Sequence, residues 1–452
     1  MSLKIDLKKG FDIKLKGSAT EELSDFALPS SYALKPTDFI GLSRPKLLVK
    51  IGDEVKSGTP ILYDKLSEGV MYSSPVSGEI IEIVRGEKRR LEEIRILPDK
   101  INKFLKFKKY SEGDIDNLSR DEIKKHVCGS GVWPNIIQRP FGLVADPDKT
   151  PKSIFISFFD SHPLSPRPSF IYENEKKFIQ VGLNIIRKLT DGKVHLNHNA
   201  DSIKHFSYDG CDNNLFSGPH PAGNVGIQIH NIDPINKGDI VWTTTPQGLI
   251  EIGRLFLDGK YDTSRKVCVV GSEVEKPRFI ESNFGINVSS VVTNNKKSKK
   301  RIISGNVLTG NSVGHDGYLG YYDNMICVLP EGDKHSFLGW IMQVPNKLSF
   351  QRELGLLSFL KPKKNEYILD TNTNGELRAF VQTGVFEKVL PMDILPTFLF
   401  KAILANDYDE MEELGIYELL EEDIALCEFV DVSKNELQKY FPAAAAAAAA
   451  AA

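Results

Sequence analysis

Apolar and polar residues alternate with a period of two near the start of the chain, on both sides of a short polar segment. The apolar sets are Leu3, Ile5 and Leu7 before residues 8–10, and Phe11, Ile13 and Leu15 after them. Successive side chains of a strand point to opposite faces, so this alternation is typical of strands with one buried face. Two such runs joined by a segment that contains Gly10 predict a β-hairpin.

Glycine and proline turns divide the next region into short apolar runs. Val49–Leu62 contains Gly52 and Gly58, and Ser74–Ile80 contains a Ser-Pro-x-x-Gly corner. Such turns place glycine at positive φ and reverse the chain, and the region resembles the biotinyl/lipoyl-type barrel-sandwich. In that family a lysine on an exposed hairpin carries a cofactor. Lys65 lies a few residues before the matching position, so a rigid docking barrel is favoured over a barrel modified at Lys65.

Residues 106–260 alternate between strand-like and helix-like patterns. Ser153–Phe159 is a continuous apolar run that ends at Asp160, as expected of a strand buried on both faces. Residues 173–189 carry apolar residues at spacings of three or four, which predicts an amphipathic helix. Further predicted elements are strands at 193–196 and 239–244 and a helix at 247–257. This order predicts a Rossmann-like α/β domain built from parallel βαβ units.

Two more units follow. A strand at Arg265–Val270, a turn at Gly271 and a second strand after Lys276-Pro277 resemble the soluble-ligand-binding β-grasp module. Asp393–Tyr440 has helical apolar spacing under a strongly acidic surface. The fold class is therefore α+β and multidomain. The predicted divisions are hairpin plus barrel at 1–105, Rossmann-like α/β at 106–260, β-grasp at 261–365, a small helical C-terminal domain at 366–442, and an alanine placeholder run at 443–452.

Composition narrows the class of protein. Lys plus Arg number 57 against 60 Asp plus Glu, which gives a net charge of −3 and argues against nucleic acid as the main partner. No signal peptide is recognisable, and the apolar runs are shorter than the roughly 20 residues of a membrane span. We therefore expect a cytoplasmic protein. The five cysteines include no CxxC pair, which favours buried free thiols over an iron–sulfur or zinc site.

A phosphate cradle is expected just before the first buried strand of the α/β unit, within Gly129–Gly142. A cradle needs several glycines so that backbone N–H groups can converge on phosphate oxygens. Here bulky Val132 and Trp133 follow Gly131. The pattern therefore argues against tight NADH or flavin binding at this loop.

Histidines supply the other candidate chemistry. His195-x-x-His198 with His205, and His220 with His230, lack an acidic or thiol third ligand, so no metal is expected. His220 lies in a Pro- and Gly-rich turn that could present a proton donor beside an α/β crevice. The alternative is a histidine that only hydrogen-bonds a backbone carbonyl. His162, which follows Asp160 at a predicted strand end, has the same two interpretations.

Motifs along nearly the whole chain carry a family resemblance. They are Val49–Arg85 with Gly86-Glu87-Lys88-Arg89, Trp133-Pro134, Arg139-Pro140, Gly218–Gly223, Gly238–Trp242, Ile303–Gly310, Tyr318–Gly320, Phe337–Trp340 and Ile424–Val430. With this order of modules, the sequence resembles the A subunits of sodium-translocating NADH:quinone reductases. These are related to the C subunit of the Rnf complex and to the NADH-binding flavoprotein subunit of complex I.

The resemblance implies a peripheral subunit on the cytoplasmic face of the bacterial inner membrane. The complex has six subunits, oxidises NADH, reduces quinone and pumps sodium in the respiratory chain, and the chief partner is a membrane-embedded subunit. NAD, flavins and the iron–sulfur centre belong to partner subunits, so this chain is expected to bind no cofactor and to be inactive alone. Cys427 stands without the second cysteine that can follow it in some relatives, where this chain has Asp431-Val432.

The sequence leaves three functions open. The leading hypothesis is a subunit that shapes or stabilises the quinone-reducing part of the complex without holding a redox centre. If the chain contacts quinone, the expected place is a crevice lined by Trp133, Arg139, His162 and His220, where Trp133 supplies an aromatic wall and Arg139 or His220 a donor. Trp133 could equally fill a vacated nucleotide pocket. The alternatives are a ligand-free assembly scaffold and an independent flavin-dependent NADH dehydrogenase. The acidic segment Asp407–Glu428 is also a candidate partner surface.

Overall fold

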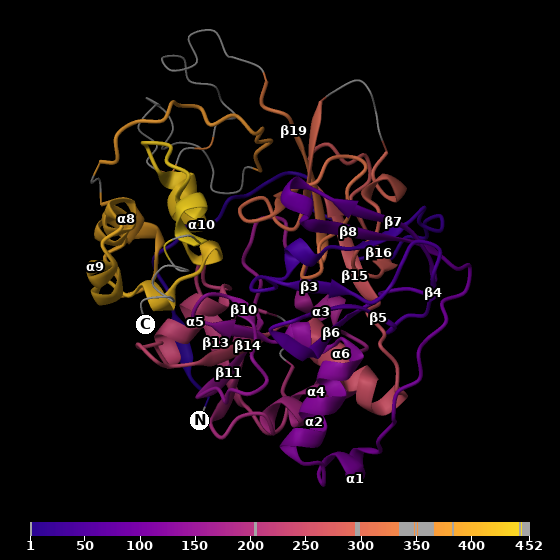
Figure 1. Ribbon diagram of the computed structural model, residues 1–452. Helices are drawn as coiled ribbons and strands as arrows, with labels where there is room; N and C mark the ends of the chain where they lie inside the picture. Colours follow the sequence, from indigo (N-terminus) through magenta and orange to yellow (C-terminus); the bar gives the residue numbers. More distant parts are fainter. Residues whose placement is uncertain are drawn as a thin grey trace.

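In the part of the chain that the structure describes, four β-sheets and a group of C-terminal helices form the fold (Figure 1). The computed structural model describes residues 2–202, 206–293, 299–333, 348, 350, 366–381, 384–442 and 444. The motif Phe337–Trp340 and the candidate metal ligand His205 lie outside the described residues.

The largest sheet has a parallel core. In spatial order its strands are β1 (Lys4–Asp6), β13 (Asp212–Ser217), β12 (Lys193–Asn199), β11 (Ser153–Phe158), β14 (Val241–Thr244), β9 (Ile137–Arg139) and β10 (Leu143–Val144). The first five are parallel, whereas β9 and β10 continue the sheet antiparallel. The strands predicted at 153–159, 193–196 and 239–244 are confirmed.

Helices cover both faces of this sheet. α4 (Lys176–Arg187) and α6 (Pro246–Asp258) pack against each other on one face, which confirms both predicted helices. A Cβ on Gly182 would collide with the backbone of Leu249, so these helices touch backbone to backbone. α5 (Val225–Ile232) contributes to the core on the opposite face.

The hairpin predicted for residues 3–15 does not form. β1 instead pairs in parallel with β13, and the Leu7 N–H donates to the Ser217 carbonyl at 2.8 Å. Beyond Gly10 the chain follows other partners, since the Phe11 N–H donates to the His220 carbonyl. The open edge of β13 offers β1 a complete row of partners, and local alternation cannot reveal such a distant edge.

The barrel consists of two small sheets. One has the order β2 (Tyr32–Leu34), β8 (Leu91–Pro98), β7 (Gly78–Arg85) and β4 (Glu54–Val55), and the other β3 (Pro45–Leu47), β5 (Pro60–Asp64) and β6 (Ser67–Ser73). Lys65 lies exposed in the tight turn between β5 and β6. Its neighbour Asp64 fixes this turn by accepting hydrogen bonds from the N–H groups of Ser43, Arg44 and Leu66.

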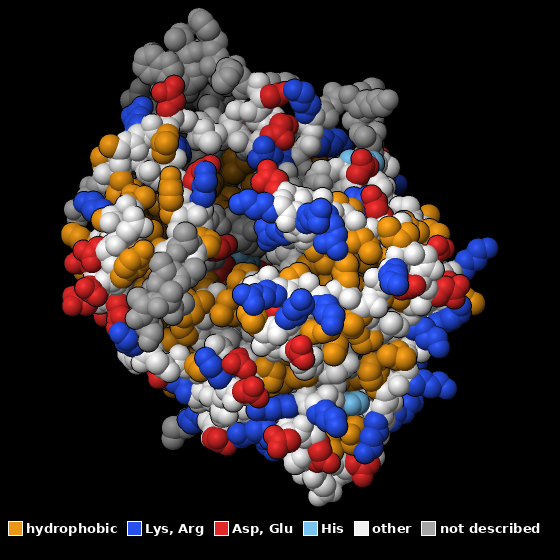
Figure 2. Space-filling model, in the orientation of Figure 1, with side chains coloured by type: hydrophobic (Ala, Val, Ile, Leu, Met, Phe, Trp, Pro, Cys, Tyr) orange, Lys and Arg blue, Asp and Glu red, His pale blue; other side chains and the backbone are white. Residues whose placement is uncertain are grey.

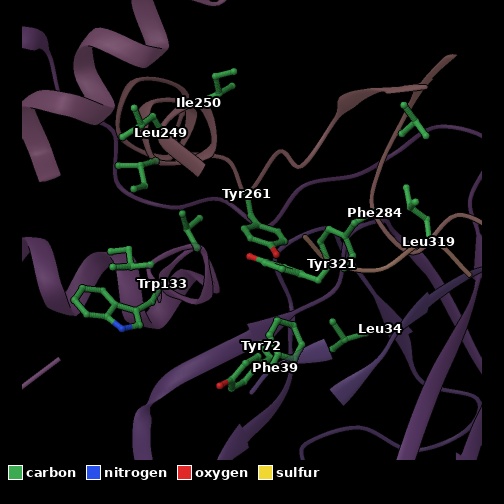
Figure 3. Close-up of a cluster of buried hydrophobic side chains, with 14 of the residues drawn as sticks. Leu34, Phe39, Tyr72, Trp133, Leu249, Ile250, Tyr261, Phe284, Leu319 and Tyr321 are labelled. Atoms are coloured by element: carbon green, nitrogen blue, oxygen red, sulfur yellow. The ribbon is translucent and has the colours of Figure 1, made fainter. Parts of the chain in front are cut away.

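A five-stranded sheet adjoins the barrel. Its order is β16 (Arg278–Ser282), β15 (Arg265–Val270), β19 (Met325–Pro330), β17 (Lys300–Ser304) and β18 (Asn311–Ser312). Aromatic residues of the barrel, such as Phe39, pack against Tyr321 at the junction, and Figure 3 shows the rings of Tyr261 and Tyr321 turned toward one another. The fully buried pair Glu251–Arg265 joins α6 to β15.

The C-terminal helices pack over the α5 side of the large sheet (Figure 1). They are α7 (Phe386–Val389), α8 (Pro396–Ala405), α9 (Tyr408–Glu413) and α10 (Glu421–Val430). Their apolar side chains share one core with Phe155 and Phe216 of the sheet, and the predicted helical C-terminal region is confirmed. Within the described part of the chain, no helix has the length and apolar character needed to span a membrane.

Candidate functional site

Two histidines meet above the carboxyl edge of the parallel sheet. His162 follows the end of β11, and His220 lies in the turn between β13 and α5. Their ring centroids are 4.8 Å apart at an interplanar angle of 49°. The structure therefore brings together two of the four candidates named from the sequence, because the carboxyl ends of parallel strands share one edge.

His162 is held by Asp160. Oδ1 of this carboxylate lies 2.8 Å from Nδ1 of the ring and also accepts hydrogen bonds from the Ser165 hydroxyl and the His162 N–H. Burial alone would raise the pKa of Asp160, but the His162 charge and these hydrogen bonds outweigh it and lower the pKa to about 2. Burial likewise opposes protonation of His162, yet Asp160 raises the pKa of the imidazole above its ordinary value. The two groups form an ion pair.

His220 has the opposite protonation state. Its side chain is 1% exposed, and burial together with the His162 charge lowers its pKa to about 3. The Ser161 hydroxyl lies 3.0 Å from Nδ1 and already accepts the Gly223 N–H. The hydroxyl can donate its proton to Nδ1 or accept from Nδ1–H through its second lone pair, so this contact fits either tautomer of His220.

Several polar atoms around the histidines lack a partner. They are Nε2 of His162, Nε2 of His220, Oδ1 of Asn224 and Oδ1 of Asp423, all buried and without a hydrogen bond to any described residue. Buried polar atoms are nearly always paired with protein, water or ligand. Spare donors and acceptors at one place therefore mark the histidine pair as a candidate binding site.

A groove opens beside His162. Its volume is about 500 Å³, within the range of small-molecule sites. The lining residues are Asp12, Ile13, Lys14, Leu15, Ser18, Ser161, His162, Pro163, Leu164 and Glu366. Asp12 also accepts the His220 N–H at 2.9 Å, which ties the groove wall to the second histidine. Leu164 has φ of 63°, a conformation that L-residues with bulky side chains rarely adopt and that is common at functional sites.

Arg139 lies in β9 rather than in a loop, and its guanidinium is buried against α10. It donates to Asp423 at 3.0 Å and also pairs with Glu422, while the Arg139 and Asp423 side chains are 2% and 0% exposed. Gly226 is required here, because a Cβ would collide with both Asp423 and Arg139. Burial raises the pKa of Glu422 despite the opposing charge of Arg139, and His162 is a further charged neighbour. Arg139 thus reaches the histidine pair only through α10.

Trp133 lies apart from the groove, in a short 3₁₀ turn (Trp133–Asn135). The side chain is fully buried, its Nε1–H donates to the Ala145 carbonyl at 2.7 Å, and its ring packs edge-on against Trp242. Figure 3 shows its indole to one side, pointing away from the rings of Tyr261 and Tyr321. Gly131 is the C-cap of the preceding helix, α2 (Arg120–Ser130), and faces Ser73, while Gly129 lies in the last turn of that helix.

The histidines considered as metal ligands, His195 and His198, lie on opposite faces of the large sheet. His195 packs against Phe155 on one face of the large sheet, and His198 against Phe158 on the other. Among the described residues no three His, Cys, Asp or Glu side chains could hold a metal. The sequence reasoning missed Glu422 and Asp423 as neighbours of Arg139. Their only signal was an acidic first helical turn, which names no partner.

Family models and relatives among known proteins match nearly the whole chain. Family models described as the NqrA N-terminal barrel-sandwich hybrid domain, the NqrA second alpha/beta domain and the NQRA C-terminal domain match residues 5–99, 118–261 and 266–314. Two relatives named as the A subunits of Na(+)-translocating NADH-quinone reductases come from Pasteurella multocida (strain Pm70) and Serratia proteamaculans (strain 568). The chain is 37% identical to each over 436 residues, which cover 96% of this chain and 96% of each relative. The relative of the same name from Histophilus somni (strain 129Pt) is 36% identical over 443 residues, 97% of this chain and 98% of the relative.

Removing the buried guanidinium should strongly destabilise the fold. We expect Arg139→Met to lower the free energy of unfolding by about 3–5 kcal/mol, because Asp423 would be left buried without a counter-charge. The matched control is Arg120→Met, whose partner Asp191 is 81% exposed, so its loss should stay below about 1 kcal/mol. Denaturant titration measures both. Equal losses would contradict the buried pair, and Arg139→Met combined with Asp423→Leu should recover part of the stability.

Acidification should destabilise the protein through His220. Its pKa falls from 6.5 in the unfolded chain to about 3 in the fold, so between pH 6 and 4 the unfolded state binds a proton that the folded state does not. Stability should therefore drop toward low pH, with a slope of up to about 1.4 kcal/mol per pH unit from this site. His220→Asn, whose amide can replace Nδ1 as the partner of Ser161, should show a shallower slope in denaturant titrations over this window.

The neighbouring pair does not mask this effect. Asp160, with its pKa lowered to about 2, loses its contribution only below pH 3.8, and His162, with its pKa raised, loses its contribution as pH rises. The control is His315→Asn, at a partly exposed histidine in the loop that follows β18. This substitution should leave the slope unchanged. An unchanged slope in His220→Asn would disprove the neutral buried imidazole.

Proposed function

Because this chain belongs to the family of A subunits of Na(+)-translocating NADH-quinone reductases, we propose that it is a peripheral subunit that contributes a quinone-binding groove and holds no redox centre. The family assignment makes it a subunit of an oxidoreductase complex, with other subunits as partners. We place it on the cytoplasmic face of the bacterial inner membrane, in a complex of six subunits, where its chief partner is a membrane-embedded subunit.

The observation that carries this proposal is His162 at the groove wall, with His220 packed against it. His162 lines the groove and forms an ion pair with Asp160, while His220 lies against it with its Nε2 unpartnered among the described residues. A quinone carbonyl accepts hydrogen bonds, and a donor on a cationic ring makes the stronger kind. A histidine held charged beside a neutral one therefore suits an acceptor that gains electron density on reduction.

The groove walls support the same ligand class. Ile13, Leu15, Pro163 and Leu164 supply the apolar part of a lining that is more polar than apolar, and His162 supplies a flat face. In this proposal His162 contacts the carbonyl, and His220 packs against His162 from the protein interior. Arg139 does not contact the ligand. It fixes the position of α10, and Glu422 of this helix is a charged neighbour of His162. Trp133 has the role of core filler, because its indole is fully buried and its N–H is already bonded.

We assign NAD, flavins and the iron–sulfur centre to partner subunits. Support comes from Gly131, which caps α2 and leaves no phosphate cradle there, and from the cysteines, which are free thiols in the structure. Burial raises the pKa of Cys268 and Cys327 to about 12, which disfavours thiolate ligands. We also assign a Rossmann-like fold to residues 106–260 and a β-grasp fold to 261–365. The strand order β13-β12-β11-β14 supports the first assignment.

Two other functions compete with the proposal. A ligand-free scaffold would leave the histidine pair and its unpartnered atoms without a role. An independent flavin-dependent NADH dehydrogenase would need a cradle that accepts a dinucleotide, and the space around Gly131 is taken by Ser73.

The purified chain should be colourless. We expect no flavin absorption and no stoichiometric iron, because neither a nucleotide cradle nor a cysteine cluster is formed by the described residues. An absorbance spectrum together with an iron assay measures this. Yellow protein with one equivalent of flavin would favour the independent dehydrogenase.

A short-chain quinone should bind the isolated chain through the groove. We expect His162→Leu to weaken binding at least about tenfold, since loss of a charged hydrogen bond costs roughly 1.5–3 kcal/mol. Trp133→Phe should lower the melting temperature with unchanged affinity, because the indole fills the core. Isothermal titration calorimetry and thermal melting separate these effects.

His315→Leu supplies the matched control, since it removes a histidine outside the groove lining. Its affinity should equal that of the unmodified chain. If the unmodified chain binds no quinone, or if Trp133→Phe and not His162→Leu weakens binding, the groove is not the quinone site.

A further inference from the structure

α8 carries apolar side chains on two faces. The inner face, with Leu399, Phe400 and Ile403, is buried in the core shared with the large sheet. The opposite side of α8 and the start of α9 expose Leu395, Phe398, Leu404 and Tyr408, which are 54%, 42%, 44% and 40% exposed. We call these four residues the outer face. Phe398 and Leu404 lie on either side of the exposed Lys401, whose Nζ is 5.9 Å from the centroid of the Phe398 ring. Single exposed apolar residues are ordinary, but four of them over one helix pair make a candidate contact surface.

Acidic residues surround the outer face. Residues 393–440 contain thirteen Asp and Glu against three Lys. Asp409, Glu410 and Glu413 are exposed on α9, and no salt bridge joins them to a described cation, whereas Glu412 pairs with Lys237. Figure 2 shows apolar side chains over α8 with acidic side chains gathered beside them at α9. Like charges this close repel one another, and a cationic partner would remove that cost.

We infer that the outer face docks a Lys- and Arg-rich amphipathic segment of another subunit of the complex. This inference rests on the proposed function as a subunit. Apolar side chains of the segment would cover Phe398 and Leu404, and its cations would lie against Asp409, Glu410 and Glu413. Segments that flank membrane spans on the cytoplasmic side are enriched in Lys and Arg, so membrane subunits offer such chemistry.

Charge complementarity selects this occupant over two others. A second copy of the chain would bring the same acidic residues face to face across a two-fold axis, which is unfavourable. An anionic lipid surface attracts basic segments and would be repelled by this one. A basic amphipathic segment offers apolar side chains for Phe398 and Leu404 and cations for the acidic residues of α9.

Assembly of the full complex tests the inference. The chain is titrated onto complex that lacks it, at low and at high salt, and binding is measured through a tag on another subunit. Phe398→Ser with Leu404→Ser should weaken binding at least about tenfold at both salt concentrations, as expected for anchors at an interface centre. Asp409→Asn with Glu410→Gln and Glu413→Gln should weaken binding at low salt and flatten its salt dependence, because screening acts on exposed charges.

Matched controls lie on the barrel. Leu66→Ser with Ile101→Ser removes two apolar side chains that are 67% and 79% exposed, and binding should equal that of the unmodified chain. All variants should keep the melting temperature, because every altered side chain is exposed. Unchanged binding of the α8 and α9 variants, or equal weakening by the barrel variant, overturns the inference.

Two further outcomes separate this inference from others. Self-association of the isolated chain that Phe398→Ser with Leu404→Ser abolishes would make the occupant a second copy and overturn the inference. Failure of the unmodified chain to assemble at all would overturn the proposed subunit function. Quinone binding by the isolated chain should stay the same in every docking variant. The proposed quinone groove and the proposed docking surface are therefore tested separately.

Discussion

The guanidinium of Arg139 ties the large sheet to the helices at the end of the chain. It is withdrawn from water between Asp423 and Glu422, and the desolvation of such groups roughly offsets their attraction. Its main effect is therefore geometric, since only one placement of α10 satisfies all three charges. Gly226 allows that placement by leaving room where any side chain would intrude. The Asn224 amide, which donates to the Glu422 carbonyl at 2.9 Å, holds the same helix end.

The position of α10 also determines the electrostatics of the histidine pair. Glu422 and Asp423 add negative charge near His162 and so reinforce Asp160 in raising its pKa. His220, in contact with His162 but deeper, has no carboxylate hydrogen-bonded to its ring and stays neutral. The surroundings thus shift the pKa values of two identical side chains in opposite directions, an arrangement typical of sites that handle charge on a ligand.

Elements that depend on local pattern were predictable, and pairings between distant segments were not. The strand at 153–158 follows from an unbroken apolar run, and α4 from apolar spacing. His162 and His220 could be placed together because both follow parallel strands at one edge. Arg139 and Asp423 are 284 positions apart, and neither residue type nor spacing indicates such a partner.

Trp133 was ambiguous because an indole beside glycines suits either a ligand wall or a filled core, and only its burial decides.

The pairing of β1 with β13 has a consequence for the order in which the nascent chain can fold. Leu3 contacts Asn214, 211 positions later, and ribosomes add about 5–20 residues per second. β1 therefore emerges about 10–40 seconds before its partner exists, and the whole barrel is synthesised in that interval. During the wait β1 is an unpaired strand, and its charged residues Lys4 and Asp6 are the kind that discourage premature edge-to-edge association.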